Sequence, residues 1–155
     1  MLALKFGGKL ALAPLFGRFL RDAMLHGRQP EDTLPDLLAP VPLSPERLQQ
    51  RGFNQSLEIA RTLARLLGIR LIPQLALRVR DTQAQASLPI ADRRINIRHA
   101  FVIAPGHLAL VKGRHIGIVD DVMTTGETLQ ELALTLKRFG AVRVTNLVVA
   151  RTMPT

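Results

Sequence analysis

Residues 116–128, Ile-Gly-Ile-Val-Asp-Asp-Val-Met-Thr-Thr-Gly-Glu-Thr, decide the fold class of this chain. The apolar run before the two acids has the composition of a buried strand, and an amphipathic helix is predicted from about Glu127 to Phe139. This helix would direct unpaired N–H groups and the positive end of its dipole toward the preceding loop, where a phosphate is favoured. The stretch therefore predicts a strand, a ligand-binding loop and a helix in an α/β sheet.

The residues between this strand and helix suit a sugar phosphate. Gly126 lets the backbone approach an anion closely, and the threonines around it add hydroxyl donors. Asp120 and Asp121 would repel the phosphate itself, but they can accept hydrogen bonds from ribose hydroxyls and share a hard cation such as Mg²⁺. The alternative is an ordinary turn with a solvated acid pair. The length of the matching string disfavours that alternative, because only isolated Asp-Asp pairs are common.

The same stretch resembles the binding signature of type I phosphoribosyltransferases: hydrophobic residues, two acids, two variable residues, then Thr-Thr/Ser-Gly-x-Thr. The resemblance implies the type I phosphoribosyltransferase fold, a doubly wound, mostly parallel sheet flanked by helices. It also implies that phosphoribosyl pyrophosphate (PRPP) binds here, with Mg²⁺ held through the ligand near the acid pair. The expected contacts to the ribose and its 5-phosphate are Asp120, Asp121, Met123, Thr124, Thr125, Gly126, Glu127 and Thr128.

Composition narrows the class of protein. A chain of 155 residues with 47% hydrophobic content can form one domain with a real core. Its net charge of +9 favours an anionic partner such as phosphate, pyrophosphate or nucleic acid, although a basic surface without a specific partner has the same charge. The absence of cysteine excludes disulfides and thiolate zinc sites, and the four histidines lack metal-ligand spacing. No apolar stretch reaches the length of a membrane span.

The chain is expected to divide into residues 1–30, a hood-like N-terminal helical segment packed on the core, and residues 31–155, the phosphoribosyltransferase-like domain. Apolar residues recur at helical spacing through residues 6–24, and Lys9 interrupts the apolar run that a signal peptide would need. A helix is therefore preferred to a signal peptide. Pro14 is expected to mark a kink or a second helix start.

Strands and helices alternate along the rest of the chain, which predicts a mostly parallel, doubly wound sheet. We expect strands at residues 37–43, 69–79 (one or two strands), 101–103, 115–119 and 142–150. A helix with an apolar stripe from Leu57 to Leu67 should begin at Asn54 or Ser56 and stop at Gly68. The stretch 80–98 lacks apolar periodicity and is expected to be a long loop.

Further motifs resemble the ComF family over about residues 5–152. They are Pro-Val-Pro-Leu at 40–43, Arg-Gly-Phe-Asn-Gln at 51–55, Arg-x-Arg-x-Thr-x-x-Gln at 78–85 and Arg-x-x-Asn at 93–96. The resemblance implies a cytoplasmic PRPP-binding protein of DNA uptake and natural competence. Single-stranded DNA and other competence proteins are its candidate partners, and a homodimer is an open expectation.

The resemblance also assigns roles to residues outside the acid pair. For Arg47 and Arg51, the alternative is that they are solvated arginines of a loop. Pyrophosphate is expected to contact Pro42, Leu43, Arg47 and Arg51. A flexible loop that closes over the reacting centre is expected to contribute Arg78, Arg80, Gln85, Arg93 and Asn96. If the site is catalytic, the residues that act are expected to be Asp120, Asp121 and Arg80.

Three functions stay open at this point. The chain can be a PRPP-binding competence protein, an active phosphoribosyltransferase that uses a purine, pyrimidine or amine acceptor and releases pyrophosphate, or a regulatory PRPP sensor. No acceptor site is evident, and Phe53 and Phe101 can either stack on a base or belong to the core. Glutaminase activity is excluded because no cysteine nucleophile exists. ComF proteins commonly carry a four-cysteine zinc module ahead of the segment matching Lys5-Phe6-Gly7-Gly8, and this chain starts where that module would end. Either the chain is truncated or this member lacks the module, and no zinc is expected in the residues present because they include no cysteine.

Overall fold

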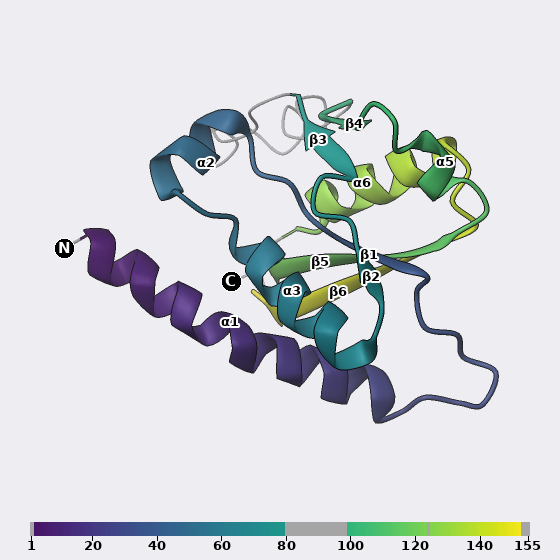
Figure 1. The fold of residues 1–155 in the computed structure, drawn as a ribbon, viewed down its shortest axis with the longest axis horizontal. Helices are drawn as coiled ribbons and strands as arrows, with labels where there is room; N and C mark the ends of the chain where they lie inside the picture. Colours follow the sequence, from purple (N-terminus) through teal and green to yellow (C-terminus); the bar gives the residue numbers. More distant parts are fainter. Residues whose placement is uncertain (1, 80–98, 124, 153–155) are drawn as a thin grey trace.

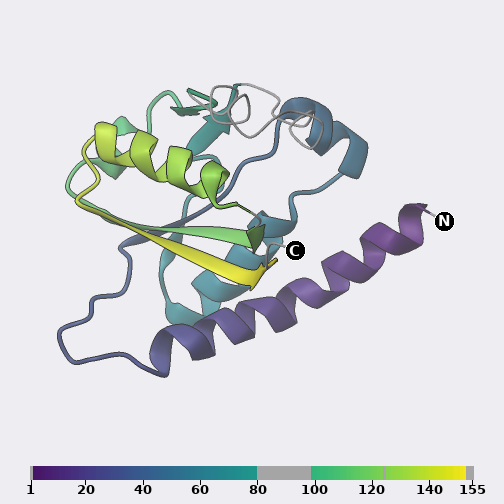
Figure 2. The same ribbon diagram turned by 180° about the vertical axis from the view of Figure 1, so that it is seen from behind.

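The computed structural model describes residues 2–79, 99–123 and 125–152. A central sheet lies between two layers (Figure 1). Helices α1 (Leu2–Leu25) and α3 (Gln55–Leu67) cover one face, and α6 (Glu127–Arg138) covers the other. Figure 2 shows the same arrangement from behind, with α1 running beneath the sheet on the side away from α6. Helices on both faces agree with the predicted doubly wound class.

The sheet has four parallel strands in the order β2-β1-β5-β6. They are β2 (Arg70–Leu71), β1 (Leu37–Pro40), β5 (His115–Met123) and β6 (Arg143–Arg151). All of β1 and the first five residues of β5 are buried, as expected for parallel strands covered on both faces. The predicted parallel sheet is confirmed, although β5 continues through the acid pair where the sequence predicted an end at residue 119.

Two short strands form a separate antiparallel pair, β3 (Ala76–Arg78) with β4 (Phe101–Ile103). The expectation of one or two strands in 69–79 is confirmed, because β2 and β3 both fall there. A four-residue helix, α5 (Leu108–Val111), connects β4 to β5. In the sequence, residues 80–98 lie between these two strands. The loop predicted there is outside the described residues, and so are Arg80, Gln85, Arg93 and Asn96.

Local capping explains α3 and reveals a helix that the sequence pattern did not predict. Asn54 caps α3 by accepting a hydrogen bond from the Ser56 N–H at 3.1 Å, and Gly68 ends it in the left-handed region at φ 67°, both as predicted. Helix α2 (Pro45–Arg51) was missed. Ser44 caps α2, but none of its seven residues is buried, so it has no apolar stripe to detect.

Helix α1 passes Pro14 without interruption, so the second helix start predicted there was wrong. Packing on both sides of the proline accounts for this. Ala13 and Leu20 are buried in the core shared with α3, and a Cβ on Gly17 would lie 2.7 Å from Thr62. This close contact with α3 compensates for the hydrogen bond that proline cannot donate. No helix in the described part of the chain is both long and apolar enough to cross a membrane.

The sheet divides the core in two. Alternate residues of β1 point to opposite faces, so Leu37 packs toward α6 and the β3–β4 pair, while Leu38 packs toward α1 and α3. Phe101 is 3% exposed and belongs to the core on the α6 side. That placement favours the core alternative for Phe101 over base stacking.

Gly117 lies at the centre of β5, where the sheet leaves no room for a side chain. A Cβ there would lie 2.7 Å from Leu38, 3.0 Å from Pro35 and 3.2 Å from Leu147. We expect Gly117→Ala to lower the free energy of unfolding by about 2 kcal/mol through overpacking, measured by urea denaturation. Gly27→Ala is the control, because nothing lies within 4 Å of a Cβ at that position. Equal stability of the two variants would contradict the prediction.

Candidate ligand-binding site

The carboxyl ends of β1 and β5 lie side by side and bring two predicted site segments together. Pro40 is in register with Val119, and the Val41 N–H donates to the Val119 carbonyl at 2.9 Å. The next residue along β5 is Asp120, and the chain leaving β1 is the Pro42-Leu43 segment assigned to pyrophosphate. Parallel strands therefore place the acid pair beside this segment, at the edge of the sheet where α/β proteins bind ligands.

Helix α2 follows this segment and carries the two arginines expected to contact pyrophosphate. Arg47 and Arg51 are both half-buried. The Arg47 Nε is buried and has no hydrogen-bond partner among the described residues. A buried guanidinium donor without a partner is unusual and suits an anion that is not part of the protein.

The acid pair is held by hydrogen bonds from two elements. Asp120 Oδ1 accepts from the Ser56 hydroxyl at 3.0 Å and from the Asp121 N–H at 2.9 Å. Asp121 Oδ1 accepts from the Val122 N–H at 2.9 Å. Because Ser56 lies in the first turn of α3, the N-terminus of α3 is joined to the end of β5.

The pKa of Asp120 is raised from 3.8 to about 7. Burial of the carboxyl is the main cause and the negative charge of Asp121 is the second, while the hydrogen bond from Ser56 acts in the opposite direction. A ligand that donates hydrogen bonds or brings a cation would favour the carboxylate form of Asp120.

The loop after β5 leads directly into α6. Gly126 adopts the left-handed region at φ 82° directly before α6, and the Thr125 hydroxyl accepts from the Glu127 N–H at 3.4 Å. The Met123 carbonyl accepts from the Thr152 N–H at 3.0 Å, which ties the loop to the end of β6. Thr124 lies outside the described residues, and the other candidate contacts are Met123, Glu127 and Thr128, all half-buried.

Arg78 ends β3, and its guanidinium lies over the Phe101 ring, 5.5 Å from the centroid. The hairpin core therefore accounts for part of its environment. The other residues expected from the flexible loop, Arg80 among them, lie outside the described residues, and their roles remain expectations.

The sequence predicts Asn54 and Ser56 only as alternative helix caps, whereas the structure places both of them at the site. The Asn54 side chain also donates to the Val41 carbonyl at 3.0 Å, and Ser56 holds Asp120. The signal was the Arg-Gly-Phe-Asn-Gln motif at 51–55, which is more specific than a cap requires. The contacts themselves join residues far apart in the sequence.

The sequence was also compared with known families. Residues 54–153 match the model of the phosphoribosyl transferase domain. The chain belongs to this family. The match includes the capped start of α3, the acid pair and the loop before α6. The type I phosphoribosyltransferase fold predicted from residues 116–128 is confirmed.

Relatives of this phosphoribosyl transferase domain confirm the resemblance to ComF proteins. The DNA utilization protein YhgH of Escherichia coli is 39% identical over 152 residues, 97% of this chain and 65% of the relative. Competence protein F of Haemophilus influenzae is 36% identical over 129 residues, 83% of this chain and 55% of the relative. The chain thus spans somewhat less than two thirds of the length of these relatives.

A solved structure supports the fold alone. The glutamine phosphoribosylpyrophosphate amidotransferase from B. subtilis, complexed with ADP and GMP, superposes with a TM-score of 0.57 at 18% sequence identity. The match covers 90% of this chain and 26% of that chain.

Proposed function

We propose that this chain binds PRPP together with Mg²⁺ at the carboxyl ends of β1 and β5. The acid pair would accept hydrogen bonds from the ribose hydroxyls, the loop of residues 123–128 would hold the 5-phosphate, and residues 42–51 would contact pyrophosphate. The observation that carries the proposal is the register of Pro40 with Val119, which places the two segments next to each other. A ligand with a ribose between two phosphate groups fits that order of donors and acceptors.

Two features of the site support an anionic ligand with a cation. The buried Arg47 Nε has no partner among the described residues, so an incoming phosphate oxygen would complete its hydrogen bonding. Asp120 and Asp121 repel one another, as the raised pKa of Asp120 reflects, and a hard cation relieves that repulsion. Mg²⁺ commonly binds through one or two carboxylates plus substrate phosphates, and when bound it would offset charge on pyrophosphate.

The test is calorimetric titration of the protein with PRPP in the presence and absence of Mg²⁺. We expect saturable binding that depends on Mg²⁺, and a protein that fails to bind PRPP under both conditions would contradict the proposal. Release of pyrophosphate with a purine, pyrimidine or amine acceptor would identify an active transferase. Binding without release would instead favour a competence role or a PRPP sensor.

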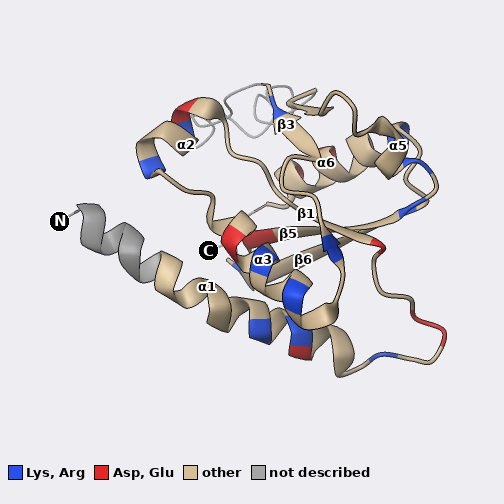
Figure 3. Cartoon of the chain, in the orientation of Figure 1, with Lys and Arg blue, Asp and Glu red and all other residues tan. Residues whose placement is uncertain are grey.

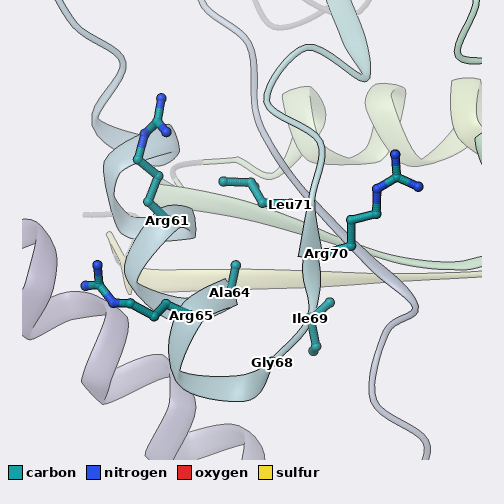
Figure 4. Close-up of a pocket in the computed structure, with 7 residues that line it drawn as sticks. All are labelled: Arg61, Ala64, Arg65, Gly68, Ile69, Arg70 and Leu71. Atoms are coloured by element: carbon teal, nitrogen blue, oxygen red, sulfur yellow. The ribbon is translucent and has the colours of Figure 1, made fainter.

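A second activity, contact with single-stranded DNA, is favoured by a basic surface at the far end of α3. Arg61, Arg65 and Arg70 line an open pocket of about 620 Å³ between the end of α3 and β2 (Figure 4). Figure 3 shows basic residues on α3 and β2, and acidic residues where β5 ends. Arg65 lies nine residues after Ser56 on α3, about 14 Å along the helix axis, and Arg70 lies beyond the end of the helix, whereas Arg61 is nearer to the acid pair.

The arginines suit an extended polyanion better than one phosphate. Figure 4 shows their guanidinium groups spreading outward in different directions. Arg61 pairs with Glu58 at 3.5 Å, whereas Arg65 and Arg70 have no ion pair among the described residues. Successive phosphates of a single strand would reach separate arginines. The names of the relatives, a DNA utilization protein and a competence protein, agree with this proposal, which includes action in the cytoplasm beside other competence proteins.

Replacing these three arginines with glutamine is expected to weaken single-stranded DNA binding roughly tenfold near physiological salt. The slope of log affinity against log salt should also fall by about 2, because each lost phosphate contact contributes roughly 0.7. Fluorescence anisotropy with a labelled oligonucleotide measures both. The control removes three other exposed arginines, Arg28, Arg114 and Arg143, with the same change in net charge. Equal losses in both triple variants would show that net charge, and not this surface, determines binding.

A further inference from the structure

The segment Asn54–Ser56 connects both halves of the proposed site. The Asn54 amide donates to the Val41 carbonyl at 3.0 Å, immediately before the pyrophosphate segment, and accepts from the Ser56 N–H at 3.1 Å. The Ser56 hydroxyl then donates to Asp120 Oδ1 at 3.0 Å. Three hydrogen bonds thus run from the end of β1, through the cap of α3, to the acid at the end of β5.

Burial makes this connection rigid. Ser56 is 5% exposed and Gln55 is 7% exposed, so water competes little with the bond to Asp120. A simple helix cap requires only the acceptor oxygen of Asn54. The donor to Val41 and the hydroxyl aimed at Asp120 are additional, and both are directed at segments of the site.

Two of the hydrogen bonds to Asp120 end on the same oxygen. Oδ1 receives the Ser56 hydroxyl and the Asp121 N–H, which fixes the carboxyl plane, and the Asp121 side chain also interacts with this carboxyl. The positive end of the α3 dipole lies on the side from which Ser56 approaches and also favours a negative charge on Asp120.

We infer that Asn54 and Ser56 are positioning residues of the PRPP site: Ser56 keeps the Asp120 carboxyl oriented, and Asn54 holds the pyrophosphate segment against it. This inference rests on the proposed function for its ligand. The hydrogen exchange of the Asp121 N–H, which donates to the oriented carboxyl, can be measured without any ligand, so the two can fail separately.

The experiment compares wild type with Ser56→Ala and Ser56→Thr, with Thr135→Val as the control. Thr135 is a buried hydroxyl on α6 that donates to the Glu131 carbonyl at 2.9 Å, on a different helix from Ser56. Hydrogen exchange of the free protein follows the Asp121 N–H, which donates to Asp120 Oδ1, and calorimetry gives PRPP affinity with Mg²⁺. Ser56→Cys, which keeps the shape and weakens the donor, replaces Ser56→Ala if that variant does not fold.

We expect Ser56→Ala to exchange the Asp121 N–H faster than wild type and to bind PRPP about tenfold more weakly. Ser56→Thr should restore both properties, and Thr135→Val should change neither. A purely structural role for Ser56 would lower thermal stability and leave both the PRPP affinity and the exchange of the Asp121 N–H unchanged. Unchanged exchange and unchanged affinity in Ser56→Ala would overturn the inference and leave the proposed function intact.

Asn54→Ser tests the other link. Serine can still cap α3, but its side chain is too short to reach the Val41 carbonyl. We expect weaker PRPP binding with unchanged exchange of the Asp121 N–H, because only the pyrophosphate segment is released. Full PRPP affinity in this variant would remove Asn54 from the inference. If wild type itself fails to bind PRPP, the proposed function fails, and the hydrogen-exchange measurement still decides the role of Ser56.

Discussion

Asp120→Asn combined with Asp121→Asn is expected to lower the affinity for PRPP with Mg²⁺ by at least about 100-fold. Each carboxylate would accept hydrogen bonds from ribose hydroxyls, and a hydrogen bond to a charged group contributes roughly 1.5–3 kcal/mol. Two such losses correspond to about 3–6 kcal/mol, or a factor of 100 or more in the dissociation constant. Asparagine keeps the size of each side chain, so isothermal titration calorimetry measures the loss of charge and acceptor strength.

A matched control separates this effect from a change in overall charge. Glu31→Gln with Asp32→Asn removes the same two negative charges from an exposed turn. That variant should bind PRPP like wild type. The double asparagine variant should remain folded, because it removes the repulsion between Asp120 and Asp121 and the cost of burying a charge. Retained PRPP affinity in a folded double asparagine variant would exclude the acid pair from the site.

Local sequence signals were sufficient to predict the central strand of the sheet and the helix that follows it. The apolar run before Asp120, the glycine at 126 and the amphipathic stretch after it predicted β5, the loop and α6, because each signal lies within a few residues of the structure it determines. The cap at Asn54 and the stop at Gly68 were predicted for the same reason. The candidate site was predicted on these elements.

Features that depend on packing could not be predicted in this way. The bond from Ser56 to Asp120 spans 64 residues, and no local pattern encodes it. Helix α2 buries none of its residues, so hydrophobic periodicity could not detect it. Pro14 indicated a kink or a second helix start, but α1 runs through it as one helix, with contacts to α3 on either side of the proline. Asp120 likewise acquires its raised pKa only from burial beside Asp121 in the folded protein.

The raised pKa of Asp120 leads to the second large prediction, a loss of stability as pH rises. The folded protein holds a proton on Asp120 up to about pH 7, whereas the unfolded chain releases it near its ordinary pKa of 3.8. Between these values the folded state binds more protons, so the free energy of unfolding decreases with increasing pH. The total loss is on the order of 4 kcal/mol and is complete above the folded pKa.

His115 contributes in the opposite sense and must be separated from Asp120. Burial, followed by the charge of Arg143, lowers the pKa of His115, so its contribution is lost as pH falls below the ordinary value of 6.5. Because His115 is present in both proteins, its contribution to the pH dependence cancels when wild type is compared with Asp120→Asn. Urea denaturation from about pH 5 to pH 8.5 should show wild type losing about 3 kcal/mol relative to the variant.

The same measurement relates stability to the proposed ligand. If Mg²⁺ and PRPP bind the ionised acid pair, they stabilise the folded form in which Asp120 is deprotonated, and the loss at alkaline pH should shrink when both are present. Asp120→Asn should show little of this ligand-dependent gain. Parallel pH profiles for wild type and variant would mean that Asp120 titrates near its ordinary value. The hydrogen bonds from Ser56 and the Asp121 N–H, which lower the pKa of Asp120, would then offset the effect of its burial.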